Sequence, residues 1–218
     1  MLGVRPHVEP VLYEMTPLSP KDSSNGYEAS AAKFMTARSR SNIGVKAVRE
    51  WVQGLPTGPT ILELGCGHGV PISQALLDEG VRLYGIDASP SMIAAFRCRF
   101  PNVPAESNAV EDSEFFGRMF DGVVAWGLMF LLEPKIQARL IHKVAAALRP
   151  DGQFLFTSPK RACEWTDNIT GRKSVSLGCD GYQVALRLAG MIITSEADDE
   201  GDNHYYFVRK PDDKGRAF

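Results

Sequence analysis

One short segment of the sequence combines an acidic residue with closely spaced glycines. Residues 61–69 read Ile-Leu-Glu-Leu-Gly-Cys-Gly-His-Gly, so Glu63 is followed by glycines at positions 65, 67 and 69. An apolar run that ends in a glycine turn before Pro71 predicts a strand, a tight turn and the start of a helix. Glycine suits such a turn because it adopts backbone angles closed to other residues and lets a ligand approach closely. The free N–H groups at a helix start suit a carboxylate or a phosphate.

A second acidic residue follows at a spacing typical of nucleotide-binding folds. Residues 81–87, Val-Arg-Leu-Tyr-Gly-Ile-Asp, predict another strand, which ends at Asp87. A carboxylate about 20 residues after the glycine turn commonly binds ribose hydroxyl groups in such folds. The alternative role for Asp87 is to cap the next helix, but Ser89 and Pro90 already supply an N-cap and a first-turn proline. We therefore expect Asp87 to bind a ribose.

The composition is typical of one globular domain and gives no sign of a nucleic-acid or membrane partner. The chain has 218 residues, of which 44% are hydrophobic and 23% are charged, and its formal net charge is −2. This near-neutral balance lacks the basic footprint of nucleic-acid-binding proteins. No apolar run approaches the roughly 18 residues of a transmembrane helix, and the N-terminus lacks the apolar segment of a secretory signal. We expect a cytoplasmic protein that binds neither nucleic acid nor a membrane.

The cysteines give no indication of a metal site. They lie at positions 66, 98, 163 and 179, without a C-x-x-C pair and without the ligand spacing of a zinc site. We therefore expect free thiols in a reducing compartment and no bound metal.

The chain divides into an arm, one domain and a tail. Residues 1–24 contain four prolines and little periodicity, which predicts a flexible N-terminal arm. Residues 25–210 are expected to form a single domain, in which residues 25–54 make a helical N-terminal cap with apolar stripes at helical spacing. Residues 211–218 predict a polar tail.

From residue 60 onward, predicted strands alternate with predicted helices. Strands are expected at 60–64, 82–87, 103–107, 120–125, 152–158, 191–197 and 204–209. Helices are expected near 71–79, 90–100, 111–117, 134–148 and 180–189. This order is typical of an α/β fold with a doubly wound parallel sheet and helices on both faces. The segment between the last two strands is too short for a crossover, so the final strand must run antiparallel.

Together these landmarks resemble the class I S-adenosylmethionine (SAM)-dependent methyltransferases over roughly residues 25–210. The G-x-G-x-G turn resembles motif I of that family and differs from the G-x-G-x-x-G turn of dinucleotide-binding proteins. Residues 120–125 look like the family's fourth strand. Residues 148–154, Leu-Arg-Pro-Asp-Gly-Gln-Phe, look like its L-x-P-G-G entry to strand five, with Asp151 in place of the first glycine.

The resemblance implies a seven-stranded Rossmann-like sheet that is mostly parallel with an antiparallel last strand. It also implies that the protein transfers a methyl group from SAM by in-line displacement and leaves S-adenosylhomocysteine (SAH) as the product. One alternative is an NAD-linked oxidoreductase, which the glycine spacing and the antiparallel last strand disfavour. A second alternative is a SAM-binding protein without transfer activity.

The resemblance further implies a set of cofactor contacts. Glu63 would orient the amino group of the methionine part, Asp87 would hold both ribose hydroxyls, and Ala88 or Ser89 would flank the adenine. Asn108 would accept from the adenine amino group, although the family often has an acid there and a simple loop role is the alternative. The full implied set is Glu63, Gly65, Cys66, Gly67, Asp87, Ala88, Ser89, Asn108, Ala109, Ala125 and Trp126.

A small-molecule acceptor is expected beyond the carboxyl ends of the strands, at the topological switch point. The loops expected at this rim are 126–132, 158–170 and 198–204. Tyr27, Phe130 and Trp165 are the substrate candidates. Phe130 has a core role as its alternative, and the helix that carries Tyr27 would form either a lid or a simple packing element. His204, whose unperturbed pKa is near neutral, is the candidate catalytic base, with a surface histidine as its alternative.

Overall fold

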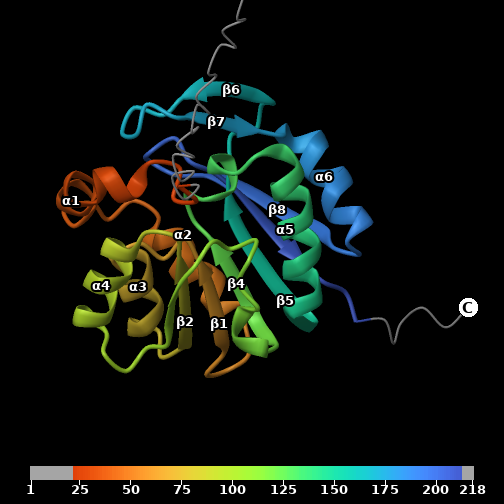
Figure 1. Ribbon diagram of the computed structural model, residues 1–218. Helices are drawn as coiled ribbons and strands as arrows, with labels where there is room; N and C mark the ends of the chain where they lie inside the picture. The colour runs from red at the N-terminus through yellow and green to blue at the C-terminus, as the bar shows by residue number, and fades with distance from the viewer. Residues whose placement is uncertain (1–21, 213–218) are drawn as a thin grey trace, which may run out of the picture.

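The structure, a computed structural model, describes residues 22–212 of the chain (Figure 1). Most of the predicted arm, 1–24, and most of the predicted tail, 211–218, therefore lie outside the described residues. Residues 23–26 form a turn that leads directly into the first helix.

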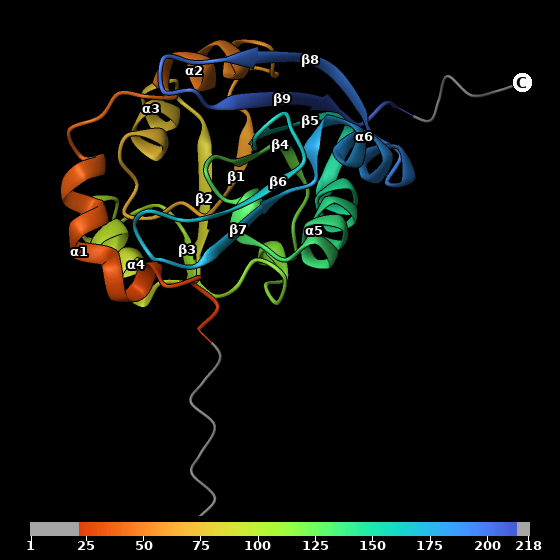
Figure 2. The ribbon, with the colours of Figure 1, turned by 90° about the horizontal axis from the view of Figure 1, so that it is seen from above.

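A seven-stranded sheet forms the centre of the molecule, with the strand order β3-β2-β1-β4-β5-β9-β8 (Figures 1 and 2). Its strands are β1 (Thr60–Leu64), β2 (Arg82–Asp87), β3 (Ala105–Ser107), β4 (Phe120–Ala125), β5 (Leu148–Thr157), β8 (Ile192–Asp198) and β9 (His204–Arg209). The strands from β3 to β5 pair in parallel, whereas β9 is antiparallel to both β5 and β8. The predicted fold class, a mostly parallel Rossmann-like sheet with an antiparallel last strand, is confirmed.

Helices cover both faces of this sheet (Figure 2). One face carries α2 (Val45–Gln53), α3 (Ile72–Asp78) and α4 (Pro90–Arg99), and the other carries α5 (Pro134–Ala147) and α6 (Gly178–Leu188). The alternation of side chains along each strand divides the core accordingly. For example, Ile61 packs with the first group of helices, and the neighbouring Leu62 packs with the second. The sheet is therefore buried on both faces, as is usual for parallel strands.

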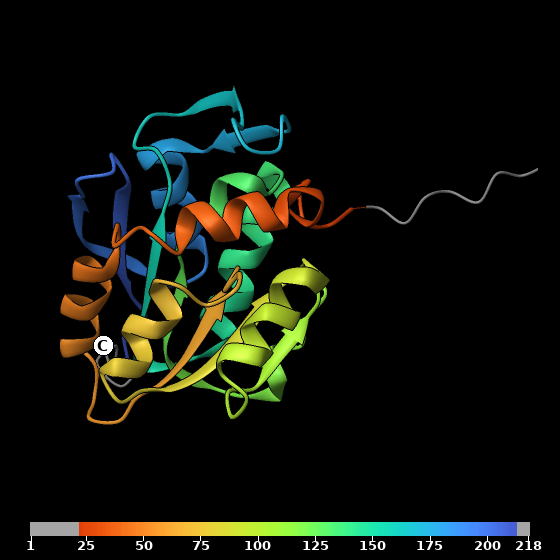
Figure 3. The same cartoon turned by 90° about the vertical axis from the view of Figure 1, so that its left-hand side faces the viewer.

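Two further elements lie beyond the carboxyl ends of the parallel strands (Figures 1 and 3). Helix α1 (Tyr27–Arg38) crosses this rim, and a two-stranded antiparallel hairpin of β6 (Cys163–Thr166) and β7 (Lys173–Ser176) covers it from the other side. The sequence predicted a loop over much of this hairpin. At its base the Ser176 hydroxyl donates to the carbonyl of Pro159, and at its turn the Asp167 carboxylate accepts from the N–H groups of Ile169 and Thr170.

The predicted helix at 111–117 is wrong. Only a 3₁₀ turn, η1 (Phe115–Gly117), forms there. Phe115 and Phe116 have φ angles of 49° and 56°, which no α-helix contains. The Phe115 side chain is buried, and its N–H donates to the Ser113 hydroxyl instead of to a helical carbonyl. Burial of the ring and this local bond outweigh the helical preference of the segment.

Candidate functional site

A cavity lies at the carboxyl ends of β1, β2 and β4, beneath α1. The glycine turn forms one side through Gly65, Cys66, Gly67 and His68, with Glu63, Asp87 and Ala88 from the adjoining strand ends. Trp126, Gly127 and Leu128 follow β4, and Tyr27, Phe34 and Arg38 enter from α1. The carboxyl ends of these strands were the expected place for a ligand in a sheet of this kind.

Two glycines of the turn serve different purposes. A Cβ atom at Gly69 would lie 2.3 Å from the Phe100 ring, so glycine is required there for packing. A Cβ atom at Gly67 would meet nothing closer than the Phe34 ring at 3.9 Å, and Gly67 lines the cavity. Any side chain at Gly67 would therefore occupy cavity space that a ligand could use. Both residues have positive φ angles, 55° at Gly67 and 89° at Gly69.

Asp87 is held at the end of β2 with its carboxylate at the cavity. One oxygen accepts from the N–H of Gly67 and the other from the N–H of Ser89, each at 2.8 Å. Burial raises the pKa of Asp87, and these two backbone bonds oppose that rise. A carboxylate fixed in this way presents its remaining lone pairs to a ligand with hydroxyl groups.

Glu63 ends β1 as a buried acid, with 3% of its surface exposed. The Ser73 hydroxyl donates to its carboxylate at 2.5 Å. Burial raises the pKa of Glu63 to about 8, and the charge of Asp87 adds to the rise, while Ser73 and Arg38 oppose it. The carboxyl group therefore holds a proton at neutral pH unless a cation enters the cavity beside it.

His68 connects the glycine turn to the end of α1. Its Nε2 atom lies 2.9 Å from the Ser39 hydroxyl, and 3% of the residue is exposed. Burial lowers the pKa of His68, and the positive charges of Arg99 and Arg38 lower it further. The imidazole is therefore neutral at neutral pH and acts as a hydrogen-bond partner of the helix end.

Four of the residues expected at the cofactor do not line the cavity, namely Ser89, Asn108, Ala109 and Ala125. The Asn108 side chain donates to Glu106, and the Ser89 hydroxyl caps α4 by accepting from the N–H of Met92. Val110, Glu111 and Met92 line this part of the cavity instead. Sequence reasoning missed them because it placed the ligand at the first residues after β3, whereas the loop turns its next two residues inward.

Only some of the residues expected to contact the methyl acceptor lie at the cavity. Tyr27 and Phe130 line the cavity, and Trp165 does not. Trp165 instead packs against Phe130 with ring centroids 5.3 Å apart, so it supports a lining residue from behind. The Tyr27 hydroxyl donates to Asp167 of the hairpin at 3.3 Å. Asn25, which sequence reasoning did not single out, also lines the cavity next to Tyr27.

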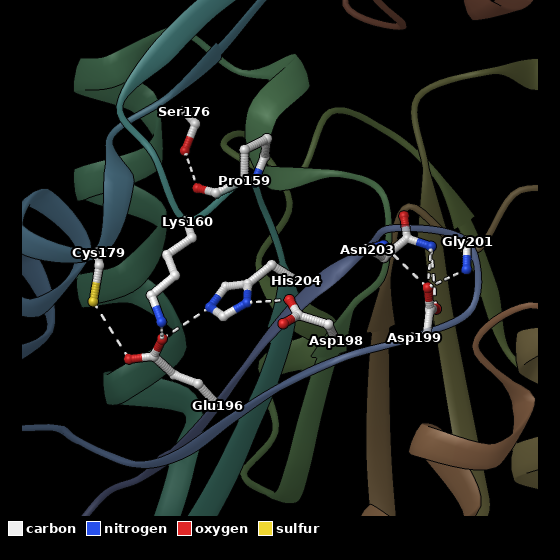
Figure 4. Close-up of polar contacts among 10 residues, drawn as sticks. All are labelled: Pro159, Lys160, Ser176, Cys179, Glu196, Asp198, Asp199, Gly201, Asn203 and His204. Atoms are coloured by element: carbon white, nitrogen blue, oxygen red, sulfur yellow. Dashed lines mark hydrogen bonds and ion pairs between the residues drawn. The ribbon is translucent and has the colours of Figure 1, made fainter.

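The structure does not place His204 at the cavity. Its side chain, 6% exposed, has Nδ1 at 2.6 Å from Asp198 and Nε2 at 2.9 Å from Glu196 (Figure 4). Side chains alternate along β9, so His204 shares its face with Tyr206, and the two rings lie 4.8 Å apart. The geometry gives no support to the prediction of a catalytic base at His204, because both ring nitrogens already have carboxylate partners on that face.

The comparison with protein families matches the segment that forms the glycine-turn side of this cavity. Residues 61–152 match the family model described as "Methyltransferase domain". This segment is similar to a methyltransferase domain. The matched segment contains the glycine turn, Asp87, the strands β2, β3 and β4, and β1 apart from its first residue, Thr60. None of the curated proteins compared with the sequence matches it.

Solved structures share the fold of this chain at low sequence identity. The CcbJ methyltransferase from Streptomyces caelestis has a TM-score of 0.68 and 15% identity, over 84% of this chain and 99% of that one. A SAM-dependent methyltransferase from Clostridium acetobutylicum has a TM-score of 0.65 and 12% identity, over 85% and 99%. The 1,6-didemethyltoxoflavin-N1-methyltransferase from Burkholderia thailandensis has a TM-score of 0.65 and 18% identity, over 89% and 93%.

The predicted resemblance to the class I SAM-dependent methyltransferases is therefore confirmed, by the family match over residues 61–152 and by the fold of these neighbours. The matched domain and these neighbours support methyl transfer from SAM as the activity. Within residues 22–212, no helix is both long and apolar enough to cross a membrane. The same residues contain no group of three or more His, Cys, Asp or Glu side chains placed to hold a metal ion.

Proposed function

We propose that this methyltransferase transfers the methyl group of SAM to a small-molecule acceptor that binds in the cavity beneath α1. The observation that carries the proposal is that one cavity joins two kinds of lining. The glycine turn and Asp87 form its polar side, and Tyr27, Phe34 and Phe130 add aromatic surface from α1 and from the segment after β4. Ligand sites usually combine such apolar walls with a few fixed polar groups.

The polar side fits SAM. Gly67 leaves space that a side chain would fill, and the Asp87 carboxylate is fixed by two backbone N–H groups so that it can accept from ribose hydroxyls. Glu63 is a buried carboxyl group that a bound ammonium would keep ionised. Met92 and Val110 offer apolar contacts to a flat ring. We assign Glu63, Gly65, Cys66, Gly67, Asp87, Ala88 and Trp126 to the cofactor on this basis.

When bound, SAM would supply a methyl group on a positively charged sulfonium sulfur, which keeps the electron pair of the broken S–C bond and leaves as the neutral thioether of SAH. The protein then mainly has to hold donor and acceptor in line, and such positioning is worth roughly 7–11 kcal/mol. A general base adds less, about 10²–10⁴-fold, and only where the acceptor must lose a proton. The absence of His204 from the cavity lining is therefore compatible with catalysis.

A small-molecule acceptor is supported by the covering of the cavity. Helix α1 crosses above it, Phe130 lines it, and Trp165 of the hairpin packs behind Phe130. Two structural neighbours have small or peptide-derived substrates in their descriptions. One is the 1,6-didemethyltoxoflavin-N1-methyltransferase with its substrate and SAH bound, and another is the glycopeptide N-methyltransferase MtfA, solved with SAM.

A panel of metabolites incubated with the protein and methyl-labelled SAM tests the proposal. We expect label in at least one small molecule. Calorimetry should give micromolar-range dissociation constants for SAM and SAH, which correspond to a binding free energy of about −8 kcal/mol, and no heat of binding for NAD. With the acceptor in hand, Phe130→Ala should lower kcat/KM for the acceptor about 10-fold and leave SAM affinity unchanged. Val184→Ala, on the exposed side of α6, is the matched control. Label that enters only protein or nucleic acid would overturn the proposal.

A further inference from the structure

Helix α1 ends at a cation that lines the cavity, Arg38. Its guanidinium donates to the Ser41 hydroxyl at 3.0 Å and to the Ile43 carbonyl at 2.9 Å. The guanidinium carbon also lies 3.8 Å from the centre of the Trp126 ring, as a cation–π contact. Within residues 22–212, the groups that contact this guanidinium directly are neutral, and burial lowers the pKa of Arg38 to about 10. A guanidinium has five N–H donors, so Arg38 retains donors for a ligand.

The Trp126 ring beneath Arg38 is fixed from the C-terminal end of the chain. Its indole N–H donates to the Tyr205 hydroxyl at 2.7 Å, and that hydroxyl donates to Asp199 at 2.6 Å. The Asp199 carboxylate is itself held by the N–H of Gly201 and by the N–H and side-chain amide of Asn203 (Figure 4). The contacts therefore form an unbroken chain from the β8–β9 loop through β9 and β4 to α1.

The protonation states along this series of hydrogen bonds favour a fixed orientation of the side chains. Burial alone would raise the pKa of Asp199, but the bonds from Tyr205 and Asn203 outweigh it and lower the pKa. Burial and the bond to Asp199 raise the pKa of Tyr205, so its hydroxyl keeps its proton and donates and accepts at once. At the start of α2, a Cβ atom on Gly44 would lie 2.5 Å from the Trp126 indole nitrogen. Glycine at this position leaves room for the indole to reach Tyr205.

Arg38 stands at the end of the cavity formed by the glycine turn. The adjacent residue, Ser39, contacts His68 of that turn, and Glu63 lies close enough that its ionised form would raise the pKa of Arg38. If SAM binds as proposed above, this end receives its methionine part, which carries a carboxylate. Carboxylates are the anions that guanidinium groups bind most readily, with charge-assisted and often paired hydrogen bonds.

We propose that Asp199, Tyr205 and Trp126 are positioning residues that hold the Arg38 guanidinium toward the cavity, where it binds the carboxylate of the cofactor's methionine part. The inference rests on the proposed function. It adds that the C-terminal β8–β9 hairpin, which lies outside the matched methyltransferase domain, acts on the cofactor. Tyr205 and Asp199 do not line the cavity, so they act through Trp126 and Arg38.

Two ligands distinguish this role from a general structural one. SAH carries the carboxylate, whereas decarboxylated SAH keeps the amino group and the nucleoside and lacks the carboxylate. We expect Arg38→Gln to weaken SAH binding about 10-fold or more, and Tyr205→Phe to weaken it about 3-fold to 10-fold. Neither change should weaken decarboxylated SAH, because the lost interaction reaches only the carboxylate. Calorimetry measures both ligands on each variant.

Tyr206→Phe is the matched control. It removes the hydroxyl of the next residue on β9, which faces the other side of the sheet and is buried without a hydrogen-bond partner in the described part of the chain. We expect unchanged affinity for both ligands. Nuclear magnetic resonance of the indole N–H signals from the three tryptophans gives a second readout. Tyr205→Phe should shift one of the three signals, that of Trp126, and Tyr206→Phe should shift none.

The outcomes separate this inference from the proposed function. Wild-type protein that binds neither ligand would contradict the proposed function itself. Wild-type protein that binds SAH, with Tyr205→Phe weakening both ligands equally or neither, would overturn only the positioning role. Should Tyr205→Phe unfold, Asp199→Ala removes the acceptor that orients the Tyr205 hydroxyl, at a residue that does not line the cavity. Asp199→Ala should show the same selective loss of SAH binding, and a loss shared by both ligands would count against the inference.

Discussion

The backbone N–H of Gly67 donates to the carboxylate of Asp87 across 2.8 Å, which ties the glycine turn after β1 to the end of β2. The other oxygen of Asp87 accepts from the N–H of Ser89, at the start of α4. One side chain therefore fixes the relative positions of the turn and of the helix that follows β2. Asp87 has a structural role in the loop in addition to its proposed role at the ribose.

Asp87→Ala should weaken SAM binding by about 1.5–3 kcal/mol, because charge-assisted hydrogen bonds to the ribose are lost. It should also lower the melting temperature, since two backbone N–H groups lose their acceptor. Asp87→Asn keeps an acceptor oxygen and should recover part of both losses. Calorimetry and thermal unfolding measure the two effects. A lower melting temperature with normal SAM affinity would show that Asp87 is structural only.

Glu63 should make the stability of the ligand-free protein fall as pH rises. Its pKa is raised from 4.5 to about 8, so between these values the folded protein keeps a proton that the unfolded chain has released. The free energy of unfolding therefore decreases with rising pH across this window, on the order of 1 kcal/mol per pH unit where the difference is complete. Urea unfolding of wild-type protein and Glu63→Gln at pH 5 and pH 8 measures this, and the variant should lack the Glu63 contribution.

The same carboxyl group should couple SAM binding to proton release. A bound ammonium favours ionised Glu63, so SAM binding near pH 7 should expel a proton and should tighten as pH rises toward 8. Calorimetry in two buffers with different ionisation enthalpies gives the number of protons released. Equal apparent enthalpies in both buffers would contradict the placement of the amino group beside Glu63.

Truncation tests whether α1 forms a lid. Removing residues 1–20 should leave SAM binding intact, whereas removing residues 1–40 should impair it. The longer deletion takes Tyr27, Phe34 and Arg38 from the cavity, and it removes Ser39 from His68. Titration of each truncated protein with SAM, after circular dichroism shows that it is folded, gives the comparison. Equal affinities would show that α1 packs on the rim without contributing to binding.

The sequence predicted the elements whose signals are local. The glycine turn and the strand that ends at Asp87 were predictable because their backbone angles, apolar runs and acidic ends all lie within short segments. The antiparallel direction of β9 followed from the length of the loop before it. These features place Glu63, Gly67 and Asp87 around the cavity as the sequence suggested.

The features that the sequence did not predict depend on contacts between distant segments. The β6–β7 hairpin is short and polar, and its fixed position comes from contacts such as that of Tyr27 with Asp167, 140 residues apart. The Asn108 side chain donates to Glu106. The hydrophobic periodicity of the sequence does not indicate whether such a side chain binds a neighbouring residue or a ligand. His204 faces Glu196 and Asp198 because of the register between β8 and β9. A shift by one residue would have turned His204 toward the other face.

A side chain on Gly44, at the start of α2, would collide with the indole of Trp126, at the end of β4. The space between the two positions therefore holds either the indole or a side chain at position 44. This shared volume is expected to leave an evolutionary trace. Relatives that retain an indole at the position of Trp126 should conserve glycine at the position of Gly44. Relatives that have gained a side chain at Gly44 should carry a smaller residue at Trp126. The two positions, 82 residues apart along the chain, should therefore covary as a pair.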